Sequence, residues 1–347
     1  MLGSPPKDPG VKALMLNRPG EAEIVSVPEP AASGDGVLVK VRRVGLCGSD
    51  LNSFRGKNPL VSFPRIPGHE ISATIVEASR RHPALGAGVD VAISPYTHCG
   101  NCPSCRRGRP NACQFNQTLG VQRDGGLTEY LVVHPARIYP ASLTLKELCL
   151  VEPLTVGCHA VARGRVENED TVAVFGCGGV GLGAVAAASF RGAKTIAVDL
   201  DDDKLRIARM AGAAHTVHSG REDLHRRLEE LTGGRGPDVA IEAIGLPETF
   251  RAAVEEVAFA GRVVYIGYAK DLVAYETRWF VQKELDILGS RNALPEDFRE
   301  VIRMLEEHRF PVEDAVSSVV TLDQVPAALR SWSDHPASVR KIMVHVD

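Results

Sequence analysis

The sequence predicts an α/β protein of two domains, one mainly β and one built on a doubly wound parallel sheet. The chain has 347 residues, which is room for about two domains of roughly 150 residues each. Short apolar alternation dominates up to about residue 133, and strand-like runs alternate with helix-like runs after about residue 150. The second pattern is typical of a parallel sheet, because parallel strands need helical crossovers between them.

The first part of the chain, from Val11 to about Val133, carries the strand signals of the mainly β domain. Gly36–Val41 and Ile71–Val76 place apolar side chains at every second position, and segments rich in Gly and Pro separate such runs. Residues 1–10 lack the basic start and the apolar centre of a signal peptide. Their density of Pro and Gly predicts a disordered extension.

The second part predicts the α/β domain and then a return to the first domain. The apolar run Lys341–Val344 has no successor in the alternation of strand and helix, so we expect 295–347 to rejoin the first domain. The expected domains are therefore 11–158 with 295–347, and 159–294. Strands are expected at 171–175, 195–199, 239–244 and 262–267, and helices from about Gly179, from about Asp203 and at 297–308.

The composition excludes several classes of partner. The chain has 40 Lys and Arg against 43 Asp and Glu, so it lacks the cationic surplus that a nucleic-acid backbone requires. The longest uncharged stretch, Thr171–Phe190, contains five glycines and begins as a strand and a turn, which argues against a membrane span. Four of the eight cysteines lie between Cys99 and Cys113, as in a metal site of a reducing compartment. We therefore expect a cytoplasmic protein.

A glycine-rich run opens the α/β domain. Gly176, Gly178 and Gly181 form a GxGxxG pattern between the apolar run Val172–Phe175 and a helix of small residues. The first glycine allows a tight turn, the second lets a pyrophosphate approach the backbone, and the third lets helix and strand pack closely. Asp199, 23 residues beyond the first glycine, can accept both ribose hydroxyls and repels a 2′-phosphate. The pattern predicts a Rossmann domain that binds NAD rather than NADP.

Four cysteines with close spacing predict a structural zinc site. Cys99, Cys102, Cys105 and Cys113 supply four thiolates, which suits a closed tetrahedral zinc site. Disulfides and an iron–sulfur cluster are the alternatives. In the bacterial ferredoxin pattern the fourth cysteine follows after three residues and precedes a proline, whereas here the gap is seven and Gln114 follows.

Further motifs identify a family resemblance. Cys47–Asp50 (CGSD), Gly68–Glu70 (GHE), Asp124–Tyr130 (DGGLTEY) and Glu152–Gly157 (EPLTVG) occur in the same order, with the four cysteines and the glycine pattern, as in zinc-dependent medium-chain dehydrogenases. The resemblance runs from about residue 11 to residue 346. It implies a GroES-like catalytic domain, a Rossmann coenzyme domain, two zinc ions per chain, NAD, and oxidation of an alcohol.

The resemblance also implies a catalytic zinc. Cys47 and His69 would bind it, with a carboxylate as third ligand and one position open to substrate. In the sorbitol dehydrogenase branch, which this chain looks like, the residues matching Glu70 and Glu152 both lie at or near the metal. The sequence does not decide between these two. Asp50 would not bind zinc itself but would contact His69 and fix the orientation of its ring.

The expected chemistry is hydride transfer. Zinc lowers the pKa of a bound alcohol, and nicotinamide accepts a hydride from the alcohol carbon. Ser49 is placed to take the alcohol proton. In many relatives a histidine five residues after the zinc cysteine passes this proton on, but Asn52 stands at that position. Because an amide cannot act as that base, the proton must leave through water or another group.

The cofactor contacts and the assembly are likewise implied by the sorbitol dehydrogenase branch. The backbone after the last two strands of the sheet would hold the nicotinamide amide. Family members pair the strand near residues 285–289 across a dimer axis, so we expect a homodimer or homotetramer. The implied contacts, with the glycines of the pattern, are Gly176, Gly178, Gly179, Val180, Gly181, Asp199, Lys204, Ile266, Gly267, Tyr268, Ser290, Arg291 and Asn292.

The substrate is expected to be a small polyhydroxy compound. Gly289–Phe298 resembles bacterial L-galactonate and L-gulonate 5-dehydrogenases, which suggests a polyol or a sugar acid. Ser53 and Asn292 stand where sorbitol dehydrogenase carries tyrosine and arginine, so the contacts to a polyol must differ. Candidate cations for a substrate carboxylate are Arg55, Arg65 and Arg291.

Other functions stay open at this point. The chain could oxidise a cyclitol, an amino alcohol or a simple secondary alcohol, or it could be a non-catalytic relative that binds zinc and a nucleotide. A zinc-free reductase of the same superfamily is disfavoured, because it would lack Cys47, His69 and the four clustered cysteines.

Overall fold

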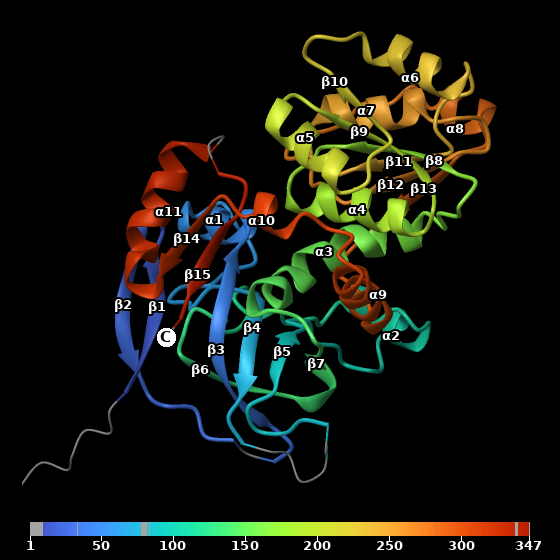
Figure 1. Cartoon of the computed structure of the whole chain (residues 1–347). Coiled ribbons are helices and arrows are strands. Elements are labelled where there is room, and N and C mark those ends of the chain that lie inside the picture. Colours follow the sequence, from blue (N-terminus) through green and yellow to red (C-terminus); the bar gives the residue numbers. More distant parts are fainter. Residues whose placement is uncertain (1–9, 33, 78–81, 83, 337–338, 347) are drawn as a thin grey trace, which may run out of the picture. The chain divides into compact units, whose positions relative to one another are not determined.

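The computed structural model describes residues 10–346, apart from residues 33, 78–81, 83 and 337–338. Residues 1–9 of the expected extension lie outside the described residues. The chain divides into two compact units, shown in Figure 1: the first comprises Met1–Glu152 with Val316–Asp347, and the second comprises Pro153–Ala315. In the part of the chain that the structure describes, no helix is long and apolar enough to cross a membrane.

The first unit is mainly β, as predicted. Its main sheet has seven strands in the order β14-β15-β3-β4-β5-β7, with β6 also paired to β3, and β1 and β2 form a separate hairpin. The strands are β1 (Val11–Arg18), β2 (Glu21–Val27), β3 (Val37–Leu46), β4 (Glu70–Ile75), β5 (Asp90–Ile93), β6 (Tyr130–Val133), β7 (Ile138–Pro140), β14 (Ser318–Thr321) and β15 (Ile342–His345). The helices are α1 (Gly48–Phe54), α2 (Pro103–Arg106), α11 (Val325–Asp334) and the first half of α3 (Leu145–Arg163).

The long strand β3 organises this unit. Val37, Val39 and Val41 are buried while the residues between them are only half-buried, which is the alternation expected of a strand with one face in the core. The last strand of the chain, β15, pairs antiparallel with β3, so that Val344 lies opposite Val44. The last strand of the chain therefore belongs to the main sheet of the first unit.

The second unit contains a six-stranded parallel sheet in the order β10-β9-β8-β11-β12-β13. This order reverses direction next to β8, as in doubly wound dinucleotide-binding folds, and confirms the predicted fold class. The strands are β8 (Thr171–Phe175), β9 (Lys194–Asp199), β10 (His215–His218), β11 (Val239–Glu242), β12 (Arg262–Tyr265) and β13 (Asp286–Gly289). The helices are α4 (Gly179–Phe190), α5 (Asp202–Met210), α6 (Leu224–Thr232), α7 (Pro247–Glu256), α8 (Arg278–Gln282), α9 (Pro295–Glu306) and α10 (Val312–Ala315).

The division into units differs from the expected one at α9. The sequence placed residues 295–315 with the first domain, whereas their contacts place them with the second unit. Asp297 lies 2.8 Å from His159 Nδ1 of α3, and both side chains are buried. Glu300 accepts two hydrogen bonds from Arg191, at 2.8 and 2.7 Å. These polar contacts fix the helix against its neighbours in the second unit.

Candidate metal centres and dinucleotide site

Three of the predicted ligands meet in the first unit. Cys47 caps the N-terminus of α1, and His69 and Glu70 stand where β4 begins. One ligand atom from each of these residues lies within 4.8 Å of the others. A thiolate, an imidazole and a carboxylate are a typical ligand set of a catalytic zinc with one open position. The residues present therefore fit the metal that the sequence predicted.

Asp50 contacts the backbone around two of these residues, Cys47 and His69. Its Oδ2 accepts a hydrogen bond from the backbone N–H of Cys47 at 2.8 Å, and its Oδ1 accepts one from Gly68 at 3.2 Å. His69 Nδ1 lies 3.8 Å from Asp50 Oδ1 and has no hydrogen-bond partner among the described residues. Burial lowers the pKa of His69, but Asp50, Cys47 and Glu152 together outweigh burial and raise the pKa well above its usual value. Asp50 and His69 thus face each other.

The two candidate carboxylates differ in their surroundings. Glu70 belongs to the three-ligand group, and both of its oxygens accept hydrogen bonds from Lys341 Nζ, at 2.6 and 2.7 Å. Glu152 does not belong to that group among the described residues, and it accepts a hydrogen bond from the Tyr96 hydroxyl. Burial raises the pKa of Glu152 to about 7. The geometry thus places Glu70, rather than Glu152, beside Cys47 and His69.

Lys341 and Tyr96 were not predicted from the sequence. The sequence offers one signal for Lys341, its position directly before the apolar closing strand. The structure shows that Lys341 is buried, and a buried lysine needs an acidic partner. Its partner could not be identified, since Glu70 is 271 residues away in the chain. Nothing in the sequence marks Tyr96 except its position shortly before the first of the four cysteines.

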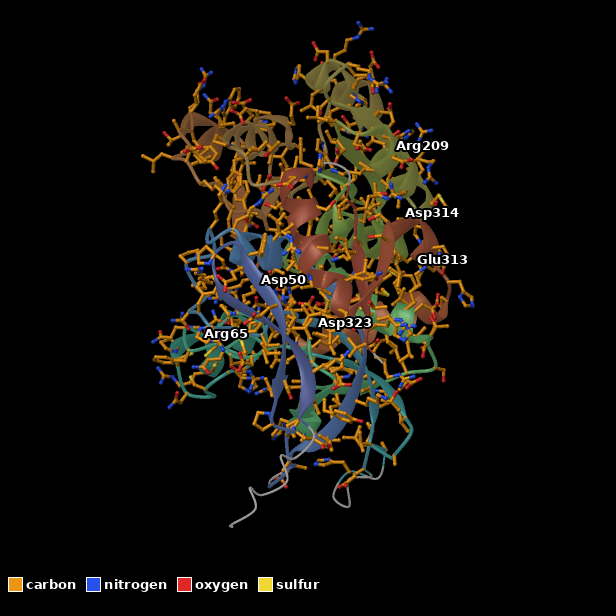
Figure 2. All side chains as sticks on the ribbon, turned by 90° about the vertical axis from the view of Figure 1, so that its left-hand side faces the viewer. Asp50, Arg65, Arg209, Glu313, Asp314 and Asp323 are labelled. Carbon is orange, nitrogen blue, oxygen red and sulfur yellow. The ribbon has the colours of Figure 1, made fainter. Side chains whose placement is uncertain are left out.

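Other predicted residues near this site lie on or beside α1. Ser49 and Asn52 are half-buried on this short helix. Two of the candidate cations have partners: Arg55 Nε donates to the Ser333 hydroxyl at 3.0 Å, and Arg65 forms an ion pair with Asp124 at 3.0 Å. Figure 2 labels Asp50 and Arg65 in this unit. These partners make Arg55 and Arg65 poorer candidates for a substrate carboxylate.

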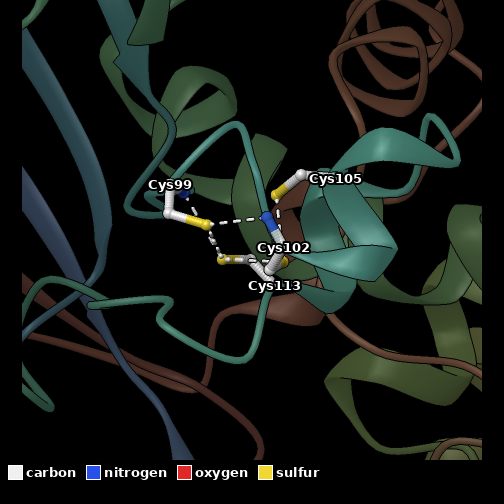
Figure 3. A group of neighbouring side chains, drawn as sticks. All are labelled: Cys99, Cys102, Cys105 and Cys113. Atoms are coloured by element: carbon white, nitrogen blue, oxygen red, sulfur yellow. Dashed lines mark hydrogen bonds between the residues drawn. The ribbon is translucent and has the colours of Figure 1, made fainter.

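The four clustered cysteines form a second centre (Figure 3). Their sulfur atoms all lie within 4.8 Å of one another. Cys102 Sγ is 3.4 Å from Cys105 Sγ and 3.8 Å from Cys113 Sγ, which in turn is 3.7 Å from Cys99 Sγ. These separations are too long for a disulfide, and they match the roughly 3.8 Å between sulfurs of a tetrahedral zinc site with Zn–S bonds of about 2.3 Å. The cluster therefore fits a structural zinc ion.

The glycine pattern lies at the turn from β8 to α4. Gly176 has a φ of +94°, and a Cβ on Gly181 would stand 1.8 Å from the Gly176 carbonyl oxygen, so both positions require glycine. Gly178 caps α4, is exposed, and would place a Cβ in open space. Gly179 and Val180, in the first turn of α4, are half-buried. This open helix N-terminus fits the pyrophosphate of a dinucleotide.

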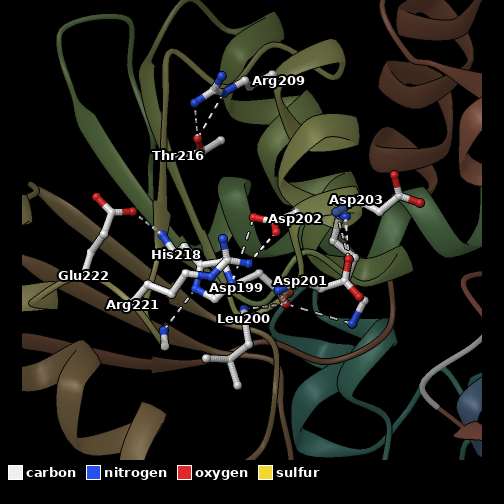
Figure 4. A network of polar contacts seen from close by, with 12 residues as sticks. Asp199, Leu200, Asp201, Asp202, Asp203, Arg209, Thr216, His218, Arg221 and Glu222 are labelled. Atoms are coloured by element: carbon white, nitrogen blue, oxygen red, sulfur yellow. Dashed lines mark hydrogen bonds and ion pairs between the residues drawn. The ribbon is translucent and has the colours of Figure 1, made fainter.

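Asp199 joins this turn to the end of β9, because its Oδ2 accepts a hydrogen bond from Cys177 N–H at 2.7 Å. Its Oδ1 accepts from Leu200 N–H at 2.7 Å and from Asp201 N–H at 3.1 Å (Figure 4). Lys204 Nζ lies 4.0 Å from Asp199 Oδ1. The carboxylate is thereby held at the position where the sequence predicts a ribose contact.

The remaining predicted cofactor contacts follow β12 and β13, which are neighbours in the sheet. The N–H groups of Ile266 and Gly267 both donate to the carbonyl of Glu242, at 2.9 and 3.2 Å. Ser290 N–H donates to the Tyr265 carbonyl at 2.9 Å. Carboxyl ends of parallel strands are the usual ligand side of such a sheet. Of the other predicted contacts, Tyr268 and Arg291 are exposed, and Asn292 is half-buried with a φ of +52°.

Comparison with known proteins supports the same assignment. The alcohol dehydrogenase GroES-like domain matches residues 33–143, and the zinc-binding dehydrogenase domain matches residues 179–307. The chain is 32% identical to the L-galactonate-5-dehydrogenase of Escherichia coli K12 over 87% of this chain and 92% of the relative. It is 33% identical to the sorbitol dehydrogenase of Bacillus subtilis over 92% of this chain and 94% of the relative.

A solved structure agrees with these matches. The alcohol dehydrogenase rspB of Escherichia coli CFT073, complexed with NADH, is 27% identical to this chain, with a TM-score of 0.89. The match covers 97% of this chain and 100% of that one. Fold, ligand set and relatives agree with the resemblance found in the motifs. The chain therefore belongs to the zinc-binding, GroES-like alcohol dehydrogenases, a family of oxidoreductases.

Proposed function

We propose that this protein is a zinc- and NAD-dependent dehydrogenase that oxidises a secondary hydroxyl of a polyol or sugar acid to a ketone. The observation that carries the proposal is the group of Cys47, His69 and Glu70. Three protein ligands of a tetrahedral zinc ion would leave the fourth position to a substrate oxygen. Zinc bound there would lower the pKa of the substrate hydroxyl, and NAD would accept the hydride.

The residues of the chain would orient the reactants and move the proton. Asp50 would hold His69 in its ligating orientation, and Ser49 would accept the proton of the substrate hydroxyl. Asn52 can donate or accept a hydrogen bond but cannot take that proton, so water or another group must carry it away. Glu70 would be the third protein ligand, and Glu152 would lie near the metal, held by Tyr96.

The cofactor would be NAD rather than NADP. The Asp199 carboxylate already accepts three backbone N–H groups, which keeps it in place at the end of β9. A carboxylate there can accept the ribose hydroxyls and repels a 2′-phosphate. Lys204 would contact the same ribose. Ile266–Tyr268 and Ser290–Asn292 would hold the nicotinamide end.

The substrate class rests on two similarities. Both the L-galactonate-5-dehydrogenase and the sorbitol dehydrogenase are relatives over almost the whole chain. We propose Arg291 as the cation for a substrate carboxylate, because it is exposed and lies in Gly289–Phe298, the segment that resembles the L-galactonate and L-gulonate 5-dehydrogenases. We further propose a homodimer or homotetramer, because the edge strand β13 exposes its residues. A cytoplasmic location would keep the zinc-binding thiols reduced.

The test is NADH formation by the zinc-loaded protein with a panel of aldonic acids, hexitols, pentitols, cyclitols and simple secondary alcohols. NADP is assayed alongside NAD. Turnover of aldonic acids or hexitols with NAD supports the proposal, and a raised KM for aldonic acids alone in Arg291→Ala would support the carboxylate contact. Turnover only of cyclitols or simple alcohols would refute the proposed substrate class, and a preference for NADP would refute the role of Asp199.

A further inference from the structure

Glu242 is a buried carboxylate that the proposed chemistry does not use. It is the last residue of β11 and is 0% exposed. Its Oε1 accepts hydrogen bonds from the N–H groups of Ile244 and Gly245, at 2.8 and 2.7 Å, and from the Thr249 hydroxyl at 2.7 Å. Its Oε2 is buried without a hydrogen-bond partner among the described residues. Such an unpaired buried oxygen is unusual and calls for a physical reason.

The same residue connects two turns at the ligand side of the sheet. Its side chain holds the turn that follows β11, and its carbonyl oxygen accepts the N–H groups of Ile266 and Gly267 in the turn that follows β12. A Cβ on Gly245, whose φ is +88°, would stand 2.8 Å from the Tyr268 carbonyl oxygen. The two turns therefore touch, and Glu242 sets their spacing.

The unpaired oxygen points at the second of these turns. A Cβ on Gly267 would stand 2.4 Å from Glu242 Oε2, so only glycine fits between this oxygen and the neighbouring turn. Gly267 lies in the segment Ile266–Tyr268, which we propose holds the nicotinamide end of NAD. The oxidised nicotinamide ring carries a positive charge, whereas the reduced ring is neutral. A carboxylate away from water interacts with such a charge more strongly than an exposed one, because solvent and salt screen it less.

We propose that Glu242 is a positioning residue for the nicotinamide, and that its buried charge favours binding of NAD⁺ over NADH. This inference rests on the proposed function, because it requires the nicotinamide to bind at Ile266–Tyr268. The hydrogen bonds of Glu242 align the two turns, and its unpaired oxygen leaves a negative charge directed at the segment that meets the ring. The consequence is a cofactor site that takes up NAD⁺ and releases NADH more readily, while hydride transfer to the bound NAD⁺ becomes less favourable.

The decisive variant is Glu242→Gln, which removes the charge while its amide oxygen can keep the hydrogen bonds of Oε1. Dissociation constants are measured for NAD⁺ and ADP-ribose by calorimetry and for NADH by fluorescence. ADP-ribose serves as a probe that lacks nicotinamide. We expect the constant for NAD⁺ to rise roughly five- to tenfold. Those for NADH and ADP-ribose should stay within about twofold of the wild type.

Two further variants separate charge from structure. Glu242→Asp keeps the charge but withdraws the carboxylate from the turn, so the affinities for NAD⁺ and NADH should fall together. Glu256→Gln is the matched control, because Glu256 is a mostly buried carboxylate at the far end of α7, paired with His225 at 2.9 Å. It should leave the ratio of the two affinities unchanged.

The outcomes distinguish this inference from the proposed function. If the wild type binds NAD⁺ and NADH but Glu242→Gln changes both affinities equally or not at all, the role of the charge is refuted while the proposed function stands. A ratio that shifts equally in Glu242→Gln and Glu256→Gln also refutes it. If the wild type binds none of the three probes, the proposed function is refuted, and this inference with it.

Discussion

Replacing Lys341 by methionine should destabilise the first unit strongly. The Lys341 ammonium is the partner of both oxygens of Glu70, at 2.6 and 2.7 Å, and the two side chains are 9% and 1% exposed. Methionine preserves the apolar stem but leaves a buried carboxylate unpaired. Removing one partner of a buried ion pair costs about 3–5 kcal/mol. For a unit of this size, each kcal/mol lowers Tm by about 2–4 °C, so we expect a fall of about 6–20 °C.

Scanning calorimetry of the zinc-stripped protein, wild type and variants alike, measures this effect, because a zinc ion on Glu70 would itself pair with the carboxylate; residual zinc is determined in parallel. The double variant Glu70→Gln with Lys341→Met should lose less stability than Lys341→Met alone, because no unpaired buried charge remains in it. Lys341→Arg is the conservative control, because it keeps a cation beside Glu70. A Lys341→Met protein that melts within about 2 °C of the wild type would refute the reasoning.

Three further changes test other parts of the structure. Cys113→Ser should lower the bound zinc by about one ion per chain, and an unchanged metal content would argue against the four-sulfur site. Gly181→Ala places a Cβ 1.8 Å from the Gly176 carbonyl oxygen, so NADH binding should fall by more than about tenfold; unaltered binding would contradict the proposed turn. Burial raises the pKa of Glu300, but Arg191, with smaller contributions from Cys158 and Arg303, outweighs burial and lowers the pKa. The pair therefore stabilises the fold above about pH 4.5 and loses this effect as the pH falls. The free energies of unfolding of the wild type and of Arg191→Met should accordingly converge in acid. A difference that stays constant with pH would show that the pair does not link stability to the ionisation of Glu300.

The fold could be predicted in outline because its signals are local. Strand and helix alternate in sequence, and β8, the glycine turn and α4 follow one another within 20 residues. The return of β15 was predicted because the strand had no place in that alternation. The docking of α9 was not, since an amphipathic pattern shows that one face is buried but not against which unit.

The residues of the candidate site could be predicted only where they belong to a short sequence motif. Cys47 and His69 lie in short patterns, and the structure brings them together. That Glu70 rather than Glu152 lies in the group with Cys47 and His69 could not be read from the sequence, because it depends on where distant segments meet. Lys341 was missed because its partner is distant in the chain, and Glu242 because its importance lies in the turns around it.

The central claim is oxidation of a polyhydroxy substrate that depends on both zinc and NAD. The most direct test compares NADH formation by the wild type and by Cys47→Ser, both with measured zinc content and with the same panel of aldonic acids and polyols. We expect turnover by the wild type with about two zinc ions per chain, and loss of turnover in the variant, which keeps about one. NADH formation that continues undiminished in Cys47→Ser, or none by the zinc-loaded wild type with any compound, would contradict the proposed function.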